Sequence, residues 1–210
     1  EVVFRVGYRH EVIPVACFSN HDTCMEKLHR ISKGCIGKYC VLESALLNPN
    51  MVLHTIGSIM SIPRIEYSKG NFCMYREAYA RGNDSTINLL MRLDEEKMKV
   101  LKNLGFFKTS VFEAGGFNMS APIESLHRYS ESSDRAISPT SVHSRYITED
   151  VSEGLVLMES IAHHIGLELP VTSSLITLAS VALGIDFRKT GRTIQRLGII
   201  NEIDMLHECR

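Results

Sequence analysis

The order of hydrophobic and polar residues along the chain changes character near residue 48. The first 18 residues are rich in Val, Ile and Phe and partly alternate with polar residues, which is typical of β-strands. Ser19 and Asn20 then begin a stretch whose apolar residues recur at helical spacing. The pattern therefore predicts two strands and a helix within residues 1–47, followed by a further short strand at Tyr39–Leu42.

From residue 48 onward the pattern is helical. A buried helix is expected at about 48–60, because Pro49 suits a first helical turn and the residues after it are apolar on all sides. Further helices are expected, in chain order, at Ile87 to Leu104, at Val151–Ile165, at Val171–Leu183 and, as a short one, at about Thr190–Leu197.

Two polar segments interrupt the helical pattern. Residues 125–144 are rich in Ser and contain Pro139, so they are predicted to form a long loop. Within the helix expected at 87–104, the consecutive acidic residues Asp94, Glu95 and Glu96 are expected to face solvent.

The pattern as a whole predicts a mainly α protein. Residues 48–210 are expected to form one all-helical domain. Residues 1–47 contain too few strands to bury an independent core, and the edges of those strands are open for pairing. We therefore expect residues 1–47 to be the end of a larger α/β domain.

Composition narrows the range of partners. The chain has 210 residues, of which 44% are hydrophobic, enough for one large domain or for one domain with a piece of another. Lys and Arg number 23 against 24 Asp and Glu, with no basic run, which argues against a nucleic acid or an anionic lipid as partner. No apolar stretch reaches the roughly 20 residues of a membrane span, and no signal peptide is recognisable.

The cysteines indicate the compartment. The chain has six, at positions 17, 24, 35, 40, 73 and 209, and none forms a C-x-x-C pair. We expect all of them to be reduced thiols in a cytoplasmic protein. A zinc site from Cys35 and Cys40 with His29, or with His163 and His164, is the alternative, but the spacing matches no common zinc pattern, so no metal is expected.

Few residues stand out as candidates for chemistry. The glycine-rich phosphate loops, the G-x-S-x-G motif and the H-E-x-x-H motif are all missing from the sequence. His54 lies within an otherwise apolar helical stretch. Burial favours its neutral form, so it is either a satisfied core histidine or a general acid and base whose basicity a partner restores.

Two charged residues further along the chain are candidates for such a partnership. Asp150 precedes the helix expected at 151–165, with Glu153 three positions on, so it is either a helix N-cap or the carboxylate that orients an imidazole. Arg145 is either a bidentate receptor for a substrate carboxylate or the partner of Glu149 in an ion pair.

Four stretches of the chain carry a family resemblance. They read VLESALLNPNMVLHT, IEYSKGNFCMYREAYARG, LDEEKMKVLKNLG and RYITEDVSEGLVLMESIAHHIGLELPVTSSLITLASVALGIDFRKTGRTIQRLGI. The last is the most specific, because its T-E-D-V, D-F and G-R-T elements recur at matching spacing. In this order the stretches resemble the octopine/nopaline (opine) dehydrogenase family, specifically its helical C-terminal substrate domain.

The resemblance implies both a fold and a cofactor. It implies a helical dehydrogenase domain like the C-terminal domain of 6-phosphogluconate dehydrogenase over residues 48–210. It also implies that residues 1–47 are the C-terminal end of a Rossmann-type coenzyme domain whose remainder precedes residue 1. NAD or NADP is then expected to bind mainly to that preceding domain, and the basic turn around Arg192 either touches it or is solvated.

The resemblance further implies an activity and its residues. His54 and Asp150 correspond to the catalytic dyad, and Arg145 to the arginine that holds the carboxylate of a 2-oxo acid. The implied reaction is the NAD(P)H-dependent reductive condensation of an amino acid with a 2-oxo acid such as pyruvate, an oxidoreduction at a CH–NH group.

Two alternatives remain open at this stage. One is another NAD(P)-dependent dehydrogenase that acts on hydroxy or keto acids without an amine. The other is a non-catalytic dimerisation module, which predicts an exposed apolar patch around Val2–Phe18. A homodimer, or pairing with a separate coenzyme-domain chain, is compatible with the open strand edges, and this chain alone is expected to be inactive.

Overall fold

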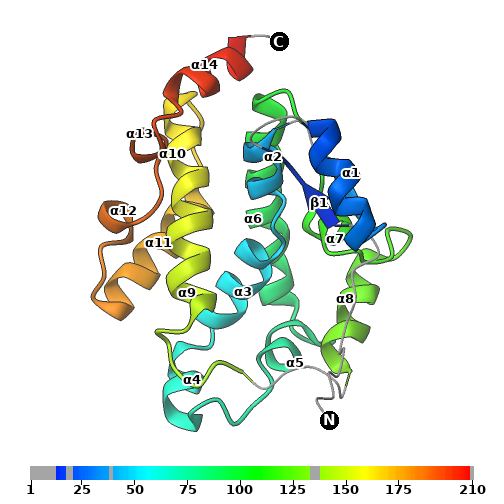
Figure 1. Cartoon of the computed structure of the whole chain (residues 1–210). Coiled ribbons are helices and arrows are strands. Elements are labelled where there is room, and N and C mark those ends of the chain that lie inside the picture. Colours follow the sequence, from blue (N-terminus) through cyan, green and yellow to red (C-terminus); the bar gives the residue numbers. More distant parts are fainter. Residues whose placement is uncertain (1–12, 18–20, 38–39, 133–137, 209–210) are drawn as a thin grey trace, which may run out of the picture.

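The computed structural model describes residues 13–17, 21–37, 40–132 and 138–208, and it is mainly helical (Figure 1). Its elements are β1 (Ile13–Val15), α1 (His21–Ile31), β2 (Cys35–Gly37), α2 (Val41–Leu46), α3 (Asn50–Ile59), α4 (Ile62–Ser68), α5 (Met74–Tyr79), α6 (Asp84–Asn103), α7 (Val111–Ala114), α8 (Pro122–Glu131), α9 (Arg145–Glu149), the π-helix η1 (Asp150–Leu155), α10 (Val156–His164), α11 (Pro170–Leu183), α12 (Phe187–Thr190), α13 (Ile194–Leu197) and α14 (Ile200–Glu208). The mainly α prediction is confirmed.

The described N-terminal residues form one small β-α-β unit. β1 pairs with β2 in parallel, with Ile13 opposite Cys35 and Val15 opposite Gly37, and α1 connects the two strands. The first expected strand and most of the apolar segment Val2–Phe18 lie outside the described residues. That this unit ends a Rossmann domain, with a boundary near residue 48, stays a prediction.

The short strand expected at Tyr39–Leu42 is wrong where the structure describes it. Val41 instead begins α2, directly after an extended Cys40. Leu42 and Leu46 stand four positions apart on this helix and are both buried, which is the spacing of a helix face in a core. The run of β-formers before residue 42 concealed this helical spacing.

Helix α3 lies at the centre of the helical part. All its residues from Met51 to Ile59 are buried. It packs against α6, α9, η1, α5 and α11, and Figure 1 shows it crossing between the α9–α10 run and α6. The helices expected at 48–60, 87–104 and 171–183 are confirmed as α3, α6 and α11.

The acidic face expected on α6 is wrong for two of its three residues. Asp94 and Glu96 are each only 1% exposed. Glu96 accepts hydrogen bonds from the Val171 and Thr172 backbone N–H groups and from the Thr172 hydroxyl, so it caps the N-terminus of α11. Asp94 accepts the backbone N–H of Val111. Both carboxylates serve neighbouring segments, which the periodicity of one helix does not reveal.

The long loop expected at 125–144 is also largely wrong. Helix α8 continues to Glu131, and its own Leu126 is fully buried. An irregular segment is found at 138–144, after the undescribed residues 133–137. Ser138 fixes the start of that segment, because its hydroxyl bonds to the backbone of both Met74 and Phe72.

The prediction of reduced cysteines is wrong for one pair. Cys17 and Cys24 form a disulfide that ties the end of β1 to α1. Their separation of 7 residues along the chain brings them together only because the chain folds back into α1 after β1. Cys35, Cys40 and Cys73 carry free thiols.

Within the described ranges, no single helix is long and apolar enough to cross a membrane; α11 and Phe187–Leu197 meet that test only together, as a pair bent by 101°. In the same residues, no group of three or more His, Cys, Asp or Glu side chains is placed to hold a metal ion. His29, one of the residues considered for zinc, bonds through Nε2 to the backbone oxygen of Cys35 at 2.8 Å.

Candidate active site

His54 and Asp150 lie in direct contact although they stand 96 positions apart in the sequence. His54 Nδ1 is 2.9 Å from Asp150 Oδ2, and both side chains are buried. An ionised carboxylate can only accept, so Nδ1 carries the donated hydrogen. The other ring nitrogen, Nε2, can then form a hydrogen bond with a second group.

Asp150 is not the helix N-cap that the sequence suggested. Helix α9 continues without a break through η1 into α10, and Asp150 has helical backbone angles, with φ −67° and ψ −28°. Its carboxylate bonds to His54 of α3. The widened π-helical turn begins at this residue, and such turns are frequent at functional sites.

Tyr146 covers one face of the His54 ring. The two ring centroids are 3.8 Å apart and the planes are inclined by only 8°, a stacked arrangement. Tyr75 approaches the imidazole edge-on from α5, with centroids 6.2 Å apart. Sequence reasoning missed Tyr146, although its position four residues before Asp150 places both on one helix face. Burial raises the pKa of Tyr146, and the charge of Arg145 opposes that rise.

The helix that carries His54 has a hydrogen bond within itself, from Thr55, and one from α5, from Tyr79. Thr55 donates its hydroxyl to the backbone oxygen of Met51 at 2.6 Å. Tyr79 donates its hydroxyl to the backbone oxygen of Leu53, and burial raises the pKa of Tyr79 far above its ordinary value. His54 of the same helix reaches a charged partner, the Asp150 carboxylate.

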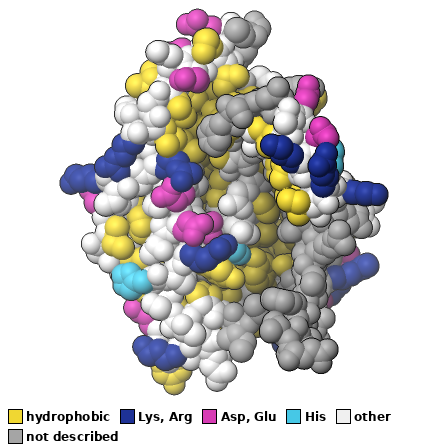
Figure 2. All heavy atoms as spheres, viewed as in Figure 1, with side chains coloured by type: hydrophobic (Ala, Val, Ile, Leu, Met, Phe, Trp, Pro, Cys, Tyr) yellow, Lys and Arg dark blue, Asp and Glu magenta, His cyan; other side chains and the backbone are white. Residues whose placement is uncertain are grey.

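A cavity of about 310 Å³ opens beside the dyad. Its wall is formed by Ser44, Ala45, Asn48, Met51, Glu149, Asp150, Glu153, Gly154 and Arg192. Asp150 thus contacts both His54 and the space in which a small molecule fits. Figure 2 shows this face of the molecule hollowed along its middle, with hydrophobic side chains in the hollow and acidic, basic and His side chains together at its edge.

Arg192 enters this cavity from a sharply fixed turn. Its side chain forms an ion pair with Glu153 on η1, and its backbone N–H donates to the oxygen of Ser152 at 2.8 Å. A Cβ on Gly191 would lie 2.6 Å from the oxygen of Phe187, so this close approach requires glycine. The short helix expected at Thr190–Leu197 is therefore found only over its second half, as α13, because this turn separates α13 from α12.

Arg145, the third predicted site residue, lies outside the contact between His54 and Asp150. It is exposed at the start of α9 and does not line the cavity beside Asp150. In the part of the chain that the structure describes, it forms no ion pair with Glu149 or any other residue. The structure therefore brings His54 and Asp150 together and leaves Arg145 next to them, one residue before Tyr146.

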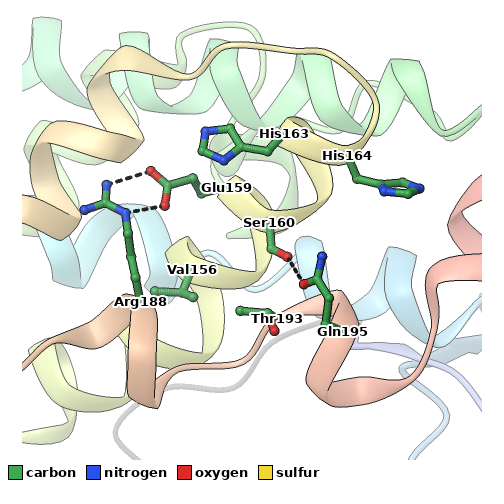
Figure 3. A pocket seen from close by; sticks show the side chains of 8 residues that line it. All are labelled: Val156, Glu159, Ser160, His163, His164, Arg188, Thr193 and Gln195. Atoms are coloured by element: carbon green, nitrogen blue, oxygen red, sulfur yellow. Dashed lines mark hydrogen bonds and ion pairs between the residues drawn. The ribbon is translucent and has the colours of Figure 1, made fainter.

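A second cavity, of about 400 Å³, is lined by residues of α10 together with Arg188, Thr193 and Gln195 (Figure 3). Glu159 and Arg188 face each other in it through two contacts of 2.7 Å. Burial opposes ionisation of Glu159, but the hydrogen bonds from Arg188 and Ser173 outweigh it and hold the pKa of Glu159 below its ordinary value. The two charges satisfy each other, so this pair joins α10 to α12 rather than offering a free charge to a ligand.

Comparison with known proteins identifies the family. Residues 39–183 match the model of the NAD/NADP octopine/nopaline dehydrogenase alpha-helical domain. The chain belongs to the octopine/nopaline dehydrogenase family. Both His54 and Asp150 lie within the matched residues, whereas Arg192 lies beyond them.

Three named proteins are similar in sequence to this octopine/nopaline dehydrogenase family member. It is 28% identical over 162 residues to an opine dehydrogenase of Arthrobacter sp. (strain 1C), covering 76% of this chain and 44% of the relative. It is 27% identical over 156 residues to a vitopine synthase of Allorhizobium ampelinum, and 28% identical over 159 residues to Protein ocs of Agrobacterium vitis. Each of these two matches covers 72% of this chain and 42% of the relative. The chain thus spans less than half the length of the curated relatives it matches.

Proposed function

We propose that this chain is the substrate-binding and catalytic half of an opine-type dehydrogenase. The reaction is the reductive condensation of an amino acid amine with a 2-oxo acid such as pyruvate. The observation that carries the proposal is the buried contact of His54 with Asp150 beside a cavity of small-metabolite size, in a member of this family.

His54 would act on the keto oxygen of the 2-oxo acid. When the amine nitrogen bonds to the carbonyl carbon, negative charge develops on that oxygen, and a proton on His54 Nε2 neutralises it. Loss of water then leaves the imine that is reduced. Asp150 holds the ring through Nδ1 and stabilises its charged form, as a triad aspartate does. General acid catalysis of this kind increases the reaction rate roughly 10²–10⁴-fold.

Arg145 would bind the carboxylate of the 2-oxo acid. It lies next to Tyr146, which stacks on His54, and its guanidinium is not engaged in an ion pair among the described residues. A planar guanidinium donates two parallel hydrogen bonds to a carboxylate, which fixes the orientation of the acid. Its role is therefore positioning, and its loss weakens substrate binding more than the chemical step.

The nicotinamide coenzyme supplies the hydride. The described residues of this chain are not suited to bind the whole dinucleotide. The cavity beside Asp150 is of small-metabolite size, and the sequence has no glycine-rich dinucleotide-binding motif. The proposal therefore keeps coenzyme binding mainly on a Rossmann-type domain that precedes residue 1. The parallel β1–α1–β2 unit is compatible with the end of such a domain.

The test is the amine dependence of coenzyme oxidation. The complete protein, with its coenzyme domain, is mixed with pyruvate, NADH or NADPH and a panel of amino acids. We expect oxidation only when an amine is present, with a product whose mass equals the two substrates minus water plus two hydrogens. Oxidation that needs no amine would support a hydroxy acid dehydrogenase, and failure to bind coenzyme would support a non-catalytic module.

A further inference from the structure

Arg192 gives the cavity beside Asp150 an uneven charge. Among the described residues that line the cavity, Glu149, Asp150 and Glu153 are acidic and Arg192 is basic. A simple anion entering this space meets repulsion from three carboxylates. A zwitterion is better suited, because its carboxylate can reach Arg192 while its ammonium group faces Glu149 and Asp150.

The backbone of Arg192 is fixed and its guanidinium is accessible. Its backbone is held by Ser152 and by the tight turn at Gly191. The Arg192 and Glu153 side chains are 42% and 39% exposed, so their ion pair is open to the cavity and to solvent. Exposed pairs of this kind contribute little to stability, about 0–1 kcal/mol, and exchange partners at low cost. Glu153 thus occupies the position that the carboxylate of a ligand would take.

We propose that Arg192 is a positioning residue that binds the α-carboxylate of the amino acid substrate, and that Glu153 is its internal competitor. This inference rests on the proposed function and adds to it a second carboxylate receptor, distinct from Arg145. Two separate arginines would then hold the two acids of the condensation, which keeps the amine and the keto carbon oriented toward each other.

The experiment compares each amino acid with the same amine lacking its carboxylate. In the complete enzyme, kcat/KM is measured for L-alanine against ethylamine and for L-arginine against agmatine, with pyruvate and NADH or NADPH at fixed concentrations. Arg192→Gln should lower the preference for the amino acid by roughly 10- to 100-fold, the loss expected for a charge-assisted hydrogen bond. The change should appear in the KM of the amino acid, while the KM of pyruvate stays the same.

Two further variants separate this role from a structural one. Arg192→Lys keeps the charge without the bidentate geometry and should show an intermediate preference. Glu153→Gln removes the competitor and should lower the KM of the amino acid, the opposite sign to Arg192→Gln. A merely structural pair would make both variants change activity in the same direction with an unaltered preference, which overturns the inference.

The outcome also distinguishes this inference from the proposed function. Amine-dependent oxidation with an unchanged preference in Arg192→Gln rejects the role of Arg192 alone. If no amine of the panel stimulates oxidation, the proposed function fails and the inference fails with it. Thermal unfolding of each variant serves as the folding control.

Discussion

The position of the His54 ring is set by two neighbours that act on different parts of it. Asp150 bonds to its edge at Nδ1, and Tyr146 lies against its face at 3.8 Å. Together they restrict both rotation in the ring plane and tilt out of it. A general acid requires such restriction, because a displacement of about 1 Å can cost a hundredfold in rate.

Replacement of Tyr146 tests the stacking contact. Tyr146→Phe keeps the ring and should leave kcat within about threefold of the wild type, whereas Tyr146→Ala frees the imidazole and should lower kcat roughly 10- to 100-fold. The measurement is steady-state kinetics on the complete enzyme, with circular dichroism as the folding control. An equal loss in both variants would show that the hydroxyl, rather than the stacking, matters.

Among the elements, the helical run from α9 through η1 to α10 positions the most groups of the candidate site. Tyr146 and Asp150 face α3 from it, and Glu153 faces the cavity. The run approaches α3 closely, because a Cβ on Gly154 would lie 2.8 Å from the Cβ of Met51. On its other side, Glu159 of α10 binds Arg188 of α12, which supports the turn that carries Arg192.

The ion pair of Glu159 with Arg188 predicts a specific acid dependence of stability. The pKa of Glu159 is lowered in the folded state, so its contribution is present above the unfolded value near 4.5 and is lost as the pH falls through the folded value. Glu159→Gln should lower the free energy of unfolding by about 1–2 kcal/mol at pH 7. The difference from the wild type should shrink toward pH 3.

Urea unfolding between pH 7 and pH 3 measures this difference. Glu66→Gln is the matched control, because Glu66 is an exposed glutamate outside the pair. A constant difference between wild type and Glu159→Gln over the whole range would contradict the role given to the Glu159 carboxylate.

The sequence predicted α3, α6 and α11 well: α6 by the helical spacing of its apolar residues, and α3 by the apolar run that follows Pro49. The contact of His54 with Asp150 was anticipated through the family resemblance, since no local pattern relates residues so far apart. Asp94 and Glu96 were misassigned to the solvent face for one physical reason: each is buried by hydrogen bonds to another segment. Such tertiary partners are invisible to helical periodicity and to capping rules.

In the molecule as a whole, the core contains a buried ion pair within α6. Lys97 Nζ lies 2.8 Å from Asp94 Oδ1, and the Lys97 side chain is fully buried. Burial lowers the pKa of Lys97, and Asp94 opposes that effect. Asp94 also accepts the backbone N–H of Val111, so the pair connects α6 to the start of α7. Removing one charge leaves the other uncompensated inside the core.

A double-mutant comparison tests this dependence. Lys97→Met and Asp94→Asn should each lower the free energy of unfolding by about 3–5 kcal/mol. The double variant should recover most of that loss, because the amide oxygen introduced by Asp94→Asn still accepts the backbone N–H of Val111 and neither charge remains buried. Chemical denaturation measures all four proteins, and strictly additive losses would contradict a buried pair.

At the scale of the whole molecule, the proposed catalysis depends on the contact of His54 with Asp150, which come from distant parts of the chain. Asp150→Asn tests this proposal most directly. The change keeps the size of the side chain but removes the charge that orients His54. In the complete enzyme, we predict a fall in kcat of roughly 10²–10⁴-fold with an unchanged dissociation constant for the coenzyme. Turnover close to that of the wild type would contradict the assignment of His54 and Asp150 as the catalytic dyad.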